Sequence, residues 1–279
     1  MEGFRKSLRR FVANRAAVAS LAFLVLVSLL ALFAPLVTSY SFEAQNLGER
    51  LVSPSWAHLM GTDSLGRDLY SRIVYGARVS MSVGIVTALV SVFFGAVYGA
   101  ISGYAGGWVD AVMMRVVDVF YTFPSLLFAI LVMVTMGSGI TSIVVALAFV
   151  GWVNLARLVR GQVLQVKEML HVEAARAMGV SSSRILVRHV FPLLWGPVIV
   201  ALTFQIPTNI MSESFLSFIG LGLQPPTSSW GTLANEGWRA MRTFPHLIVF
   251  PGIVLFLTLL AFQFVGDGLR DVLDPKSRA

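Results

Sequence analysis

Long apolar runs without a charged side chain alternate with shorter polar stretches along the whole chain. A helix needs about 20 mainly apolar residues to cross a bilayer. The runs reach or approach that length, so the pattern predicts an all-α polytopic membrane protein. We expect six transmembrane helices, at residues 17–37, 79–103, 114–136, 140–156, 191–223 and 247–265.

Breaks inside the apolar runs set several of these boundaries. The uncharged stretch 119–156 is too long for one crossing, and Gly137-Ser138-Gly139 divides it into two. The first run follows a basic head, as a secretory signal peptide would. The run is longer than the apolar region of such a peptide, and no small-residue cleavage site follows closely. We therefore expect it to be a retained anchor.

The distribution of basic residues predicts which side of the membrane each segment faces. The chain has 21 Lys and Arg residues against 14 Asp and Glu. With the N-terminus inside, 15 of the 21 fall in cytoplasmic segments and six outside. Cytoplasmic loops carry the excess of Lys and Arg, so both termini are expected to be cytoplasmic. The net charge of +7 thus indicates membrane topology and lipid contact, and does not indicate nucleic-acid binding.

Composition and motifs argue against catalysis by this chain. It is 56% hydrophobic and 13% charged, against roughly 25% charged for a soluble domain. None of its three lysines stands in a P-loop, and the H-E-x-x-H pattern is missing. The four histidines fall on opposite predicted sides of the membrane, and the chain has no cysteine. We expect no enzyme activity, no metal and no cofactor.

One acidic residue, Glu213, lies inside the fifth predicted span. An ionisable group at membrane depth is costly and marks a pathway or a buried pair. One interpretation places Glu213 on a translocation route with Gln205 and Asn209 of the same helix. The other is a carboxylate near the outer end of the span, satisfied by a neighbouring helix or water.

The outer segment before the second span has a helical pattern over residues 62–78. Asp63 can cap a helix start, and Leu65, Leu69 and Ile73 recur on one face. The polar residues between them predict a helix along the outer membrane surface. It would contact a partner protein, or serve only as a structural lead-in to the span.

At the inner end of span three, Arg115 and Asp118 are spaced for a structural ion pair.

The inner segment 157–192 predicts two short helices joined by a turn. Its composition favours helix up to Met178, Gly179 permits a sharp turn, and a second helix starts at residues 181–183. Glu173 and Arg176 stand three residues apart, where they can pair. The alternative is a basic loop that binds anionic lipid headgroups.

Glu173-Ala174-Ala175, three more residues and Gly179, followed by Pro192, resemble the EAA loop of permease subunits in bacterial ABC importers. The family pattern ends in isoleucine-x-leucine-proline, of which this chain keeps only the proline. Three other stretches resemble the C-type subunit of the dipeptide, oligopeptide and nickel importers. They are HLMGTDSLGRD with YGAR (58–68, 75–78), LSFIGLGLQPP with SWG (216–226, 229–231), and GDGLRD with LDP (266–271, 273–275).

This resemblance implies a type I ABC importer permease fold, with a core of five helices and an N-terminal extra helix, in the bacterial inner membrane. The implied partners are a homologous second permease, two ATP-binding subunits and an extracytoplasmic solute-binding protein. Contact with the ATPase is implied for Glu173, Ala174, Ala175, Arg176 and Gly179. Contact with an outer partner is expected for Asp63, Arg67 and Asp68.

The expected parts of the chain are a cytoplasmic tail (1–16), the first span (17–37), an extracytoplasmic segment (38–78), the transmembrane core (79–267) with its coupling loop (157–192), and a second cytoplasmic tail (268–279). Small peptides are the expected cargo, and nickel, glutathione or another small solute is the alternative within the same architecture. An ion-coupled secondary transporter would need inverted repeats and ion ligands at the midplane, which the sequence does not show. A membrane scaffold would not need a coupling loop.

Overall fold

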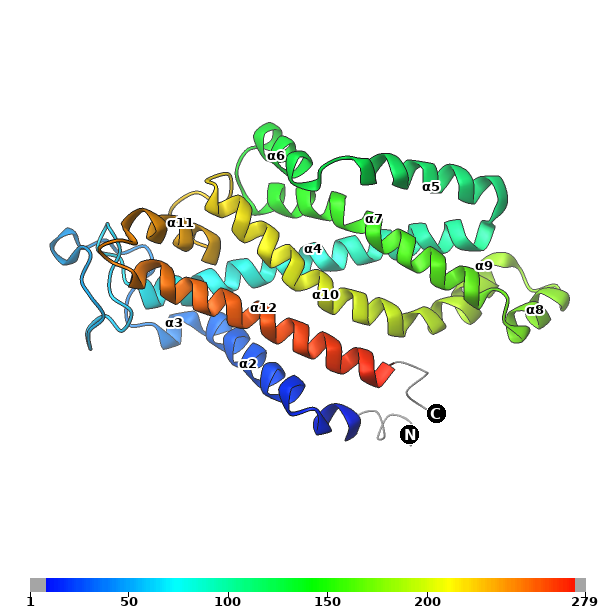
Figure 1. The fold of residues 1–279 in the computed structure, drawn as a ribbon, viewed down its shortest axis with the longest axis horizontal. Helices are drawn as coiled ribbons and strands as arrows, with labels where there is room; N and C mark the ends of the chain where they lie inside the picture. Colours follow the sequence, from blue (N-terminus) through cyan, green and yellow to red (C-terminus); the bar gives the residue numbers. More distant parts are fainter. Residues whose placement is uncertain (1–8, 274–279) are drawn as a thin grey trace.

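The computed structural model describes residues 9–273, and all its regular elements are helices. The main helices run nearly parallel to the long axis of the molecule (Figure 1). Their bounds are α2 (Arg15–Leu32), α3 (Ala34–Val37), η1 (Leu47–Glu49), α4 (Leu69–Ala105), α5 (Gly107–Thr122), α6 (Ser125–Met136), α7 (Ile140–Val166), α8 (Leu170–Ala177), α9 (Ser182–Ile185), η2 (Leu186–Val190), α10 (Phe191–Phe218), α11 (Trp230–Ala240) and α12 (His246–Leu273).

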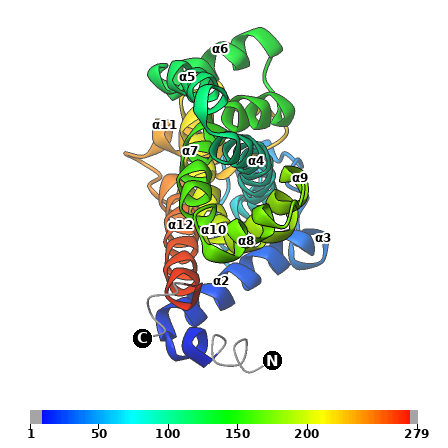
Figure 2. The ribbon, with the colours of Figure 1, turned by 90° about the vertical axis from the view of Figure 1, so that its right-hand side faces the viewer.

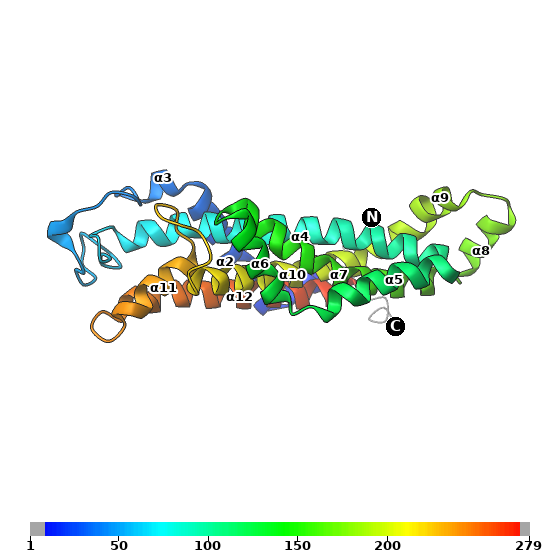
Figure 3. The same ribbon diagram turned by 90° about the horizontal axis from the view of Figure 1, so that it is seen from above.

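The bundle is layered around α4, α7 and α10. Viewed along the long axis, these three helices lie between α5 and α6 on one side and α2 and α12 on the other (Figure 2). The short helices α8 and α9 occupy one end of the molecule, and α11 with the loops before α4 occupies the opposite end (Figure 3). The start of α2 packs against the end of α12, where Gly268 contacts Ala17.

Five helices in the described part of the chain are long and apolar enough to cross a membrane: α2, α4, α7, the segment Ser182–Phe218, and α12. The pair α5–α6 passes the same test together but is bent by 82°. Counting this pair as one span gives six, in agreement with the prediction of an all-α protein with six transmembrane helices. The bend falls at Phe123 and Pro124, because proline disfavours helical backbone in the residue before it.

The predicted surface helix over residues 62–78 is wrong in two respects. The helix starts at Leu69 and continues without a break to Ala105, so it leads directly into the span. Its N-cap is Asp68, whose side chain accepts a hydrogen bond from the Ser71 amide, and not Asp63. Asp63 instead accepts from the amides of Leu65 and Arg67 within a tight loop. A local carboxylate–backbone turn therefore replaces the expected helical turn.

Close packing of α4 on α7 depends on a row of small residues. Gly95, Gly99 and Gly103 recur every four residues along α4 and face the backbone of α7. A Cβ at Gly99 would collide with the carbonyl oxygen of Ala156, and one at Gly103 would lie 2.9 Å from that of Arg160. Small residues at this spacing let membrane helices approach closely, where van der Waals contact replaces the hydrophobic effect.

Candidate functional site

The end of the molecule opposite α11 carries two short helices joined by a tight turn (Figure 3). Helix α8 ends at Ala177 with Met178 as its C-cap, and Gly179 adopts a left-handed conformation with φ of +77°. The amide of Gly179 donates to the carbonyl of Arg176, and that of Val180 donates to Ala175. This pair of bonds is a Schellman motif, in which glycine ends the helix because it tolerates positive φ. The predicted turn at Gly179 between two short helices is confirmed, but residues 157–166 of the predicted loop belong to the long helix α7, and α8 starts only at Leu170.

The buried side of this helix pair anchors it to the bundle. Val172 and Ala175 lie one turn apart on α8 and pack into an apolar cluster with Ile185 of α9. The same cluster includes residues of α4, α7 and α10. The pair is therefore attached to the long central helices by packing.

The opposite side of α8 has no partner within the described chain. Glu173, Ala174, Arg176 and Gly179 are exposed, and the apolar side chains of Leu170 and Met178 are 83% and 76% exposed. Large apolar groups beside charged ones on a protruding tip are typical of an interaction surface. Of the residues expected to contact an ATPase, Ala175 alone is buried. No ion pair joins Glu173 to Arg176 within residues 9–273, although their spacing would allow one.

Next to this tip, two arginines of α7 hold α5 in place. Arg160 donates from Nε and Nη2 to the two carboxylate oxygens of Asp110, at 2.6 and 2.5 Å. Three residues earlier, Arg157 donates to Asp118 at 2.6 Å. The pair expected from the sequence, Arg115 with Asp118, is present at 3.9 Å with Arg115 largely exposed. The tertiary pair to Arg157 is therefore the stronger one.

Glu213 is fully buried where α10 crosses α4. One carboxylate oxygen accepts from Ser217 at 2.7 Å, and the other accepts from Ser80 of α4 at 3.2 Å. Ser80 in turn accepts from the amide of Trp230, the first residue of α11. The cluster thus joins three helices, as the structural alternative for Glu213 requires.

The two residues grouped with Glu213 also bond inside the protein. Gln205 donates to the side-chain oxygen of Asn209 at 3.0 Å, and Asn209 donates to the carbonyl of Gly84 on α4 at 3.4 Å. Gln205 is only half-buried, whereas Asn209 is buried. A role on the translocation route stays a prediction for all three.

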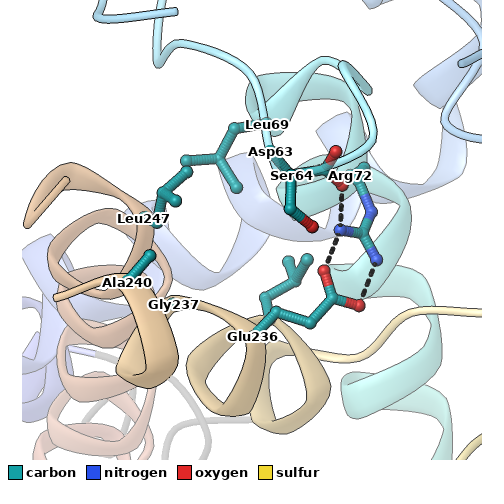
Figure 4. Close-up of a pocket in the computed structure, with 9 residues that line it drawn as sticks. Asp63, Ser64, Leu69, Arg72, Glu236, Gly237, Ala240 and Leu247 are labelled. Carbon is teal, nitrogen blue, oxygen red and sulfur yellow. Dashed lines mark hydrogen bonds and ion pairs between the residues drawn. The ribbon is translucent and has the colours of Figure 1, made fainter. Parts of the chain in front are cut away.

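At the α11 end, Asp63 and Arg67 belong to a buried ion cluster. Asp63 bonds Arg67 and Arg72, each at 2.6 Å, and both arginines also bond Glu236 of α11. Figure 4 shows the bonds of Arg72 to Asp63 and Glu236. Two cations thus alternate with two carboxylates. The cavity beside them holds only about 30 Å³, roughly one water molecule. The cluster fixes the loop before α4 to α11.

Asp68 lies in a second buried group. It bonds His58 at 2.9 Å and caps α4 through Ser71. Asp63, Arg67 and Asp68 are all buried. They therefore support the surface at the α11 end from beneath and are not part of it. Their contact with an outer partner stays a prediction.

The sequence reasoning missed α11 and with it Glu236. A signal was available, since Ser229 and Thr232 form a capping box at the start of α11. The pairing of Asp110 with Arg160 was also missed. Its residues lie 50 positions apart, and no local spacing connects them.

Comparison with known proteins agrees with this architecture. Residues 95–279 match the family described as binding-protein-dependent transport system inner membrane component, and residues 4–54 match the N-terminal TM domain of oligopeptide transport permease C. The oligopeptide transport system permease protein OppC of Bacillus subtilis is 42% identical over 99% of this chain and 90% of its own length. The glutathione transport system permease protein GsiD of Pectobacterium atrosepticum is 42% identical over 99% and 92%.

Among solved structures, a chain of the MetNI methionine ABC transporter in inward-facing conformations superposes with a TM-score of 0.60 at 17% identity, covering 72% of this chain and 96% of its own. At that identity the likeness concerns the fold, which is the type I ABC importer permease fold. Family match, relatives and fold agree along the chain. The protein therefore belongs to the family of binding-protein-dependent transport system inner membrane components, as a multi-pass permease subunit of an ABC importer.

Proposed function

We propose that this permease forms half of a translocation pathway for small peptides, coupled to separate ATPase subunits through α8 and the turn at Gly179. The second half would come from a homologous permease, and a solute-binding protein would deliver cargo at the α11 end. Both termini would lie on the cytoplasmic side, where α8 and α9 project. Hydrolysis of ATP would take place on other chains, because this one carries no P-loop.

The observation that supports this most is the exposed tip of α8. It combines Glu173 and Arg176 with two exposed apolar side chains, and its buried side packs on α4, α7 and α10. An ATPase pressing on this tip would move the central helices as a unit. Rigid displacement of packed helices is a common way to convert a local event into a change of access across a bundle.

Reconstituted complex in proteoliposomes tests the coupling assignment. Glu173→Lys should abolish the stimulation of ATP hydrolysis by loaded binding protein and stop peptide uptake. The matched control is Glu43→Lys, which makes the same charge reversal at another exposed residue. Glu43 lies in the segment between α3 and α4, far along the chain from α8. Full uptake by the Glu173 variant in an intact complex would refute the assignment.

Competition assays on the same vesicles test the cargo. Uptake of a labelled dipeptide and a labelled pentapeptide should be inhibited by unlabelled peptides and not by nickel. Inhibition by glutathione alone would show that the cargo is glutathione, as named for the Pectobacterium relative, and not a general small peptide. The coupling assignment would not be affected.

A further inference from the structure

A second cavity lies at the α11 end of the molecule, and nothing in the transport role requires it. It measures about 200 Å³ and is lined by Phe42, Tyr75, Arg78, Val79, Thr227 and Ser228. These residues come from three separate segments: the chain after α3, the outer part of α4, and the loop before α11. We propose that this cavity binds the phosphodiester headgroup of a phospholipid.

The position of Arg78 places the cavity at the bilayer surface. Its guanidinium donates to the carbonyls of Ala31 and Leu32, each at 3.0 Å. Those carbonyls end α2, which at 18 residues is about as long as one bilayer crossing. Arg78 therefore lies at the depth where the hydrocarbon ends and headgroup phosphates begin. Exposed apolar side chains of α3 beside it, among them Leu36, are suited to contact acyl chains.

The donors of the cavity suit a phosphate. Arginine has five N–H groups, and the two bonds to α2 leave most of those on Arg78 for a ligand. No carboxylate lies within ion-pairing distance of Arg78 in the described chain, in contrast with Arg67 and Arg72 nearby. A cation without an acidic partner at a membrane surface favours an anionic group.

A second, independent observation is the hydroxyl of Ser228. This residue is 2% exposed and lines the cavity, yet its hydroxyl has no hydrogen-bond partner among residues 9–273. A buried polar atom without a partner costs free energy. A phosphate oxygen in the cavity would accept from Ser228 and from Arg78 together.

The aromatic wall defines the shape of the site. Phe42 and Tyr75 stack with ring centroids 4.4 Å apart, and the guanidinium of Arg78 lies 5.5 Å from the centre of the Tyr75 ring. Stacking fixes the segment after α3 against α4, and the ring holds the guanidinium from one side. Tyrosine is enriched at this depth because its ring is amphipathic. The bound headgroup would link the end of α2 to α4 and to the loop before α11.

Native mass spectrometry of the assembled complex tests the proposal. Delipidated complex is titrated with phosphatidylglycerol, with phosphatidylethanolamine, and separately with glycerol 3-phosphate and inorganic phosphate. The wild-type complex should retain one phospholipid at this site, the anionic one more tightly, and neither soluble phosphate should displace it. Displacement by either one would overturn the lipid assignment in favour of a free phosphate.

Three variants localise the binding. Arg78→Gln should weaken retention about tenfold, because it removes a charge-assisted bond, and Ser228→Ala about threefold. The control, Arg239→Gln, removes an exposed charge from α11 at the same end and should leave binding unchanged. If Ser228→Ala binds like wild type while Arg78→Gln merely lowers the melting temperature, Arg78 only caps α2 and the proposal fails.

Discussion

The guanidinium of Arg160 on α7 holds both carboxylate oxygens of Asp110 on α5, and Asp110 also accepts from Ser102 of α4 at 2.5 Å. One carboxylate on α5 therefore joins three helices: α5, α4 and α7. A bidentate arginine–carboxylate pair is the strongest form of side-chain ion pair. It ties α5 to α7, together with the pair of Arg157 and Asp118.

Arg160→Gln should lower the stability of the complex by about 1–3 kcal/mol, because it leaves a largely buried carboxylate without its cation. Thermal unfolding in detergent measures the change. Arg115→Gln is the control: its ion pair spans 3.9 Å and its side chain is 84% exposed, so a shift below about 0.5 kcal/mol is expected. Equal shifts for both variants would show that the Asp110 pair adds nothing.

Gly179 should tolerate substitutions in the order Asn, then Ala, then Val. No atom lies within 4 Å of a Cβ added there, so a new side chain would not clash. The positive φ alone disfavours substitution, because left-handed backbone costs most residues about 1–2 kcal/mol and costs Asn less. Stimulated ATP hydrolysis in the reconstituted complex should fall in that order. If Asn is as harmful as Val, contact with the ATPase and not backbone conformation limits the position.

Gly99→Ala should reduce the yield of folded complex severely, since the new Cβ meets the α7 backbone and the helices must separate. Gly161→Ala is the matched control on α7 itself, where no atom lies within 4 Å. Size-exclusion profiles after extraction compare the two. The control should behave as wild type or gain up to about 1 kcal/mol from the better helix propensity of alanine; similar profiles would contradict the close-packing account.

Glu213→Gln should lower complex stability by about 1 kcal/mol, because an amide offers one oxygen where serine hydroxyls now reach two. Uptake per folded complex should not change. Ser212→Ala is the control, since Ser212 bonds only its own helix, at Thr208. Altered transport kinetics with unchanged stability would instead assign Glu213 to the translocation route.

The apolar pattern alone predicted most of the fold. Residues 17–37 and 247–265 correspond to α2 with α3 and to α12, and the break at Gly137–Gly139 separates α6 from α7. These features follow from the cost of burying polar backbone in lipid, which acts on each segment separately. The turn at Gly179 was also predictable, because a Schellman motif is a local structure that favours glycine at positive φ.

Only the tertiary structure decided how charges are used. The sequence pointed to Asp63 as the helix cap, whereas in the folded chain Asp68 caps α4 and Asp63 bonds the arginines facing Glu236. Glu213 and Asp110 likewise found partners on other helices. A charged group is satisfied by whichever partner the packing brings near it, so its role depends on distances between helices that no sequence spacing contains.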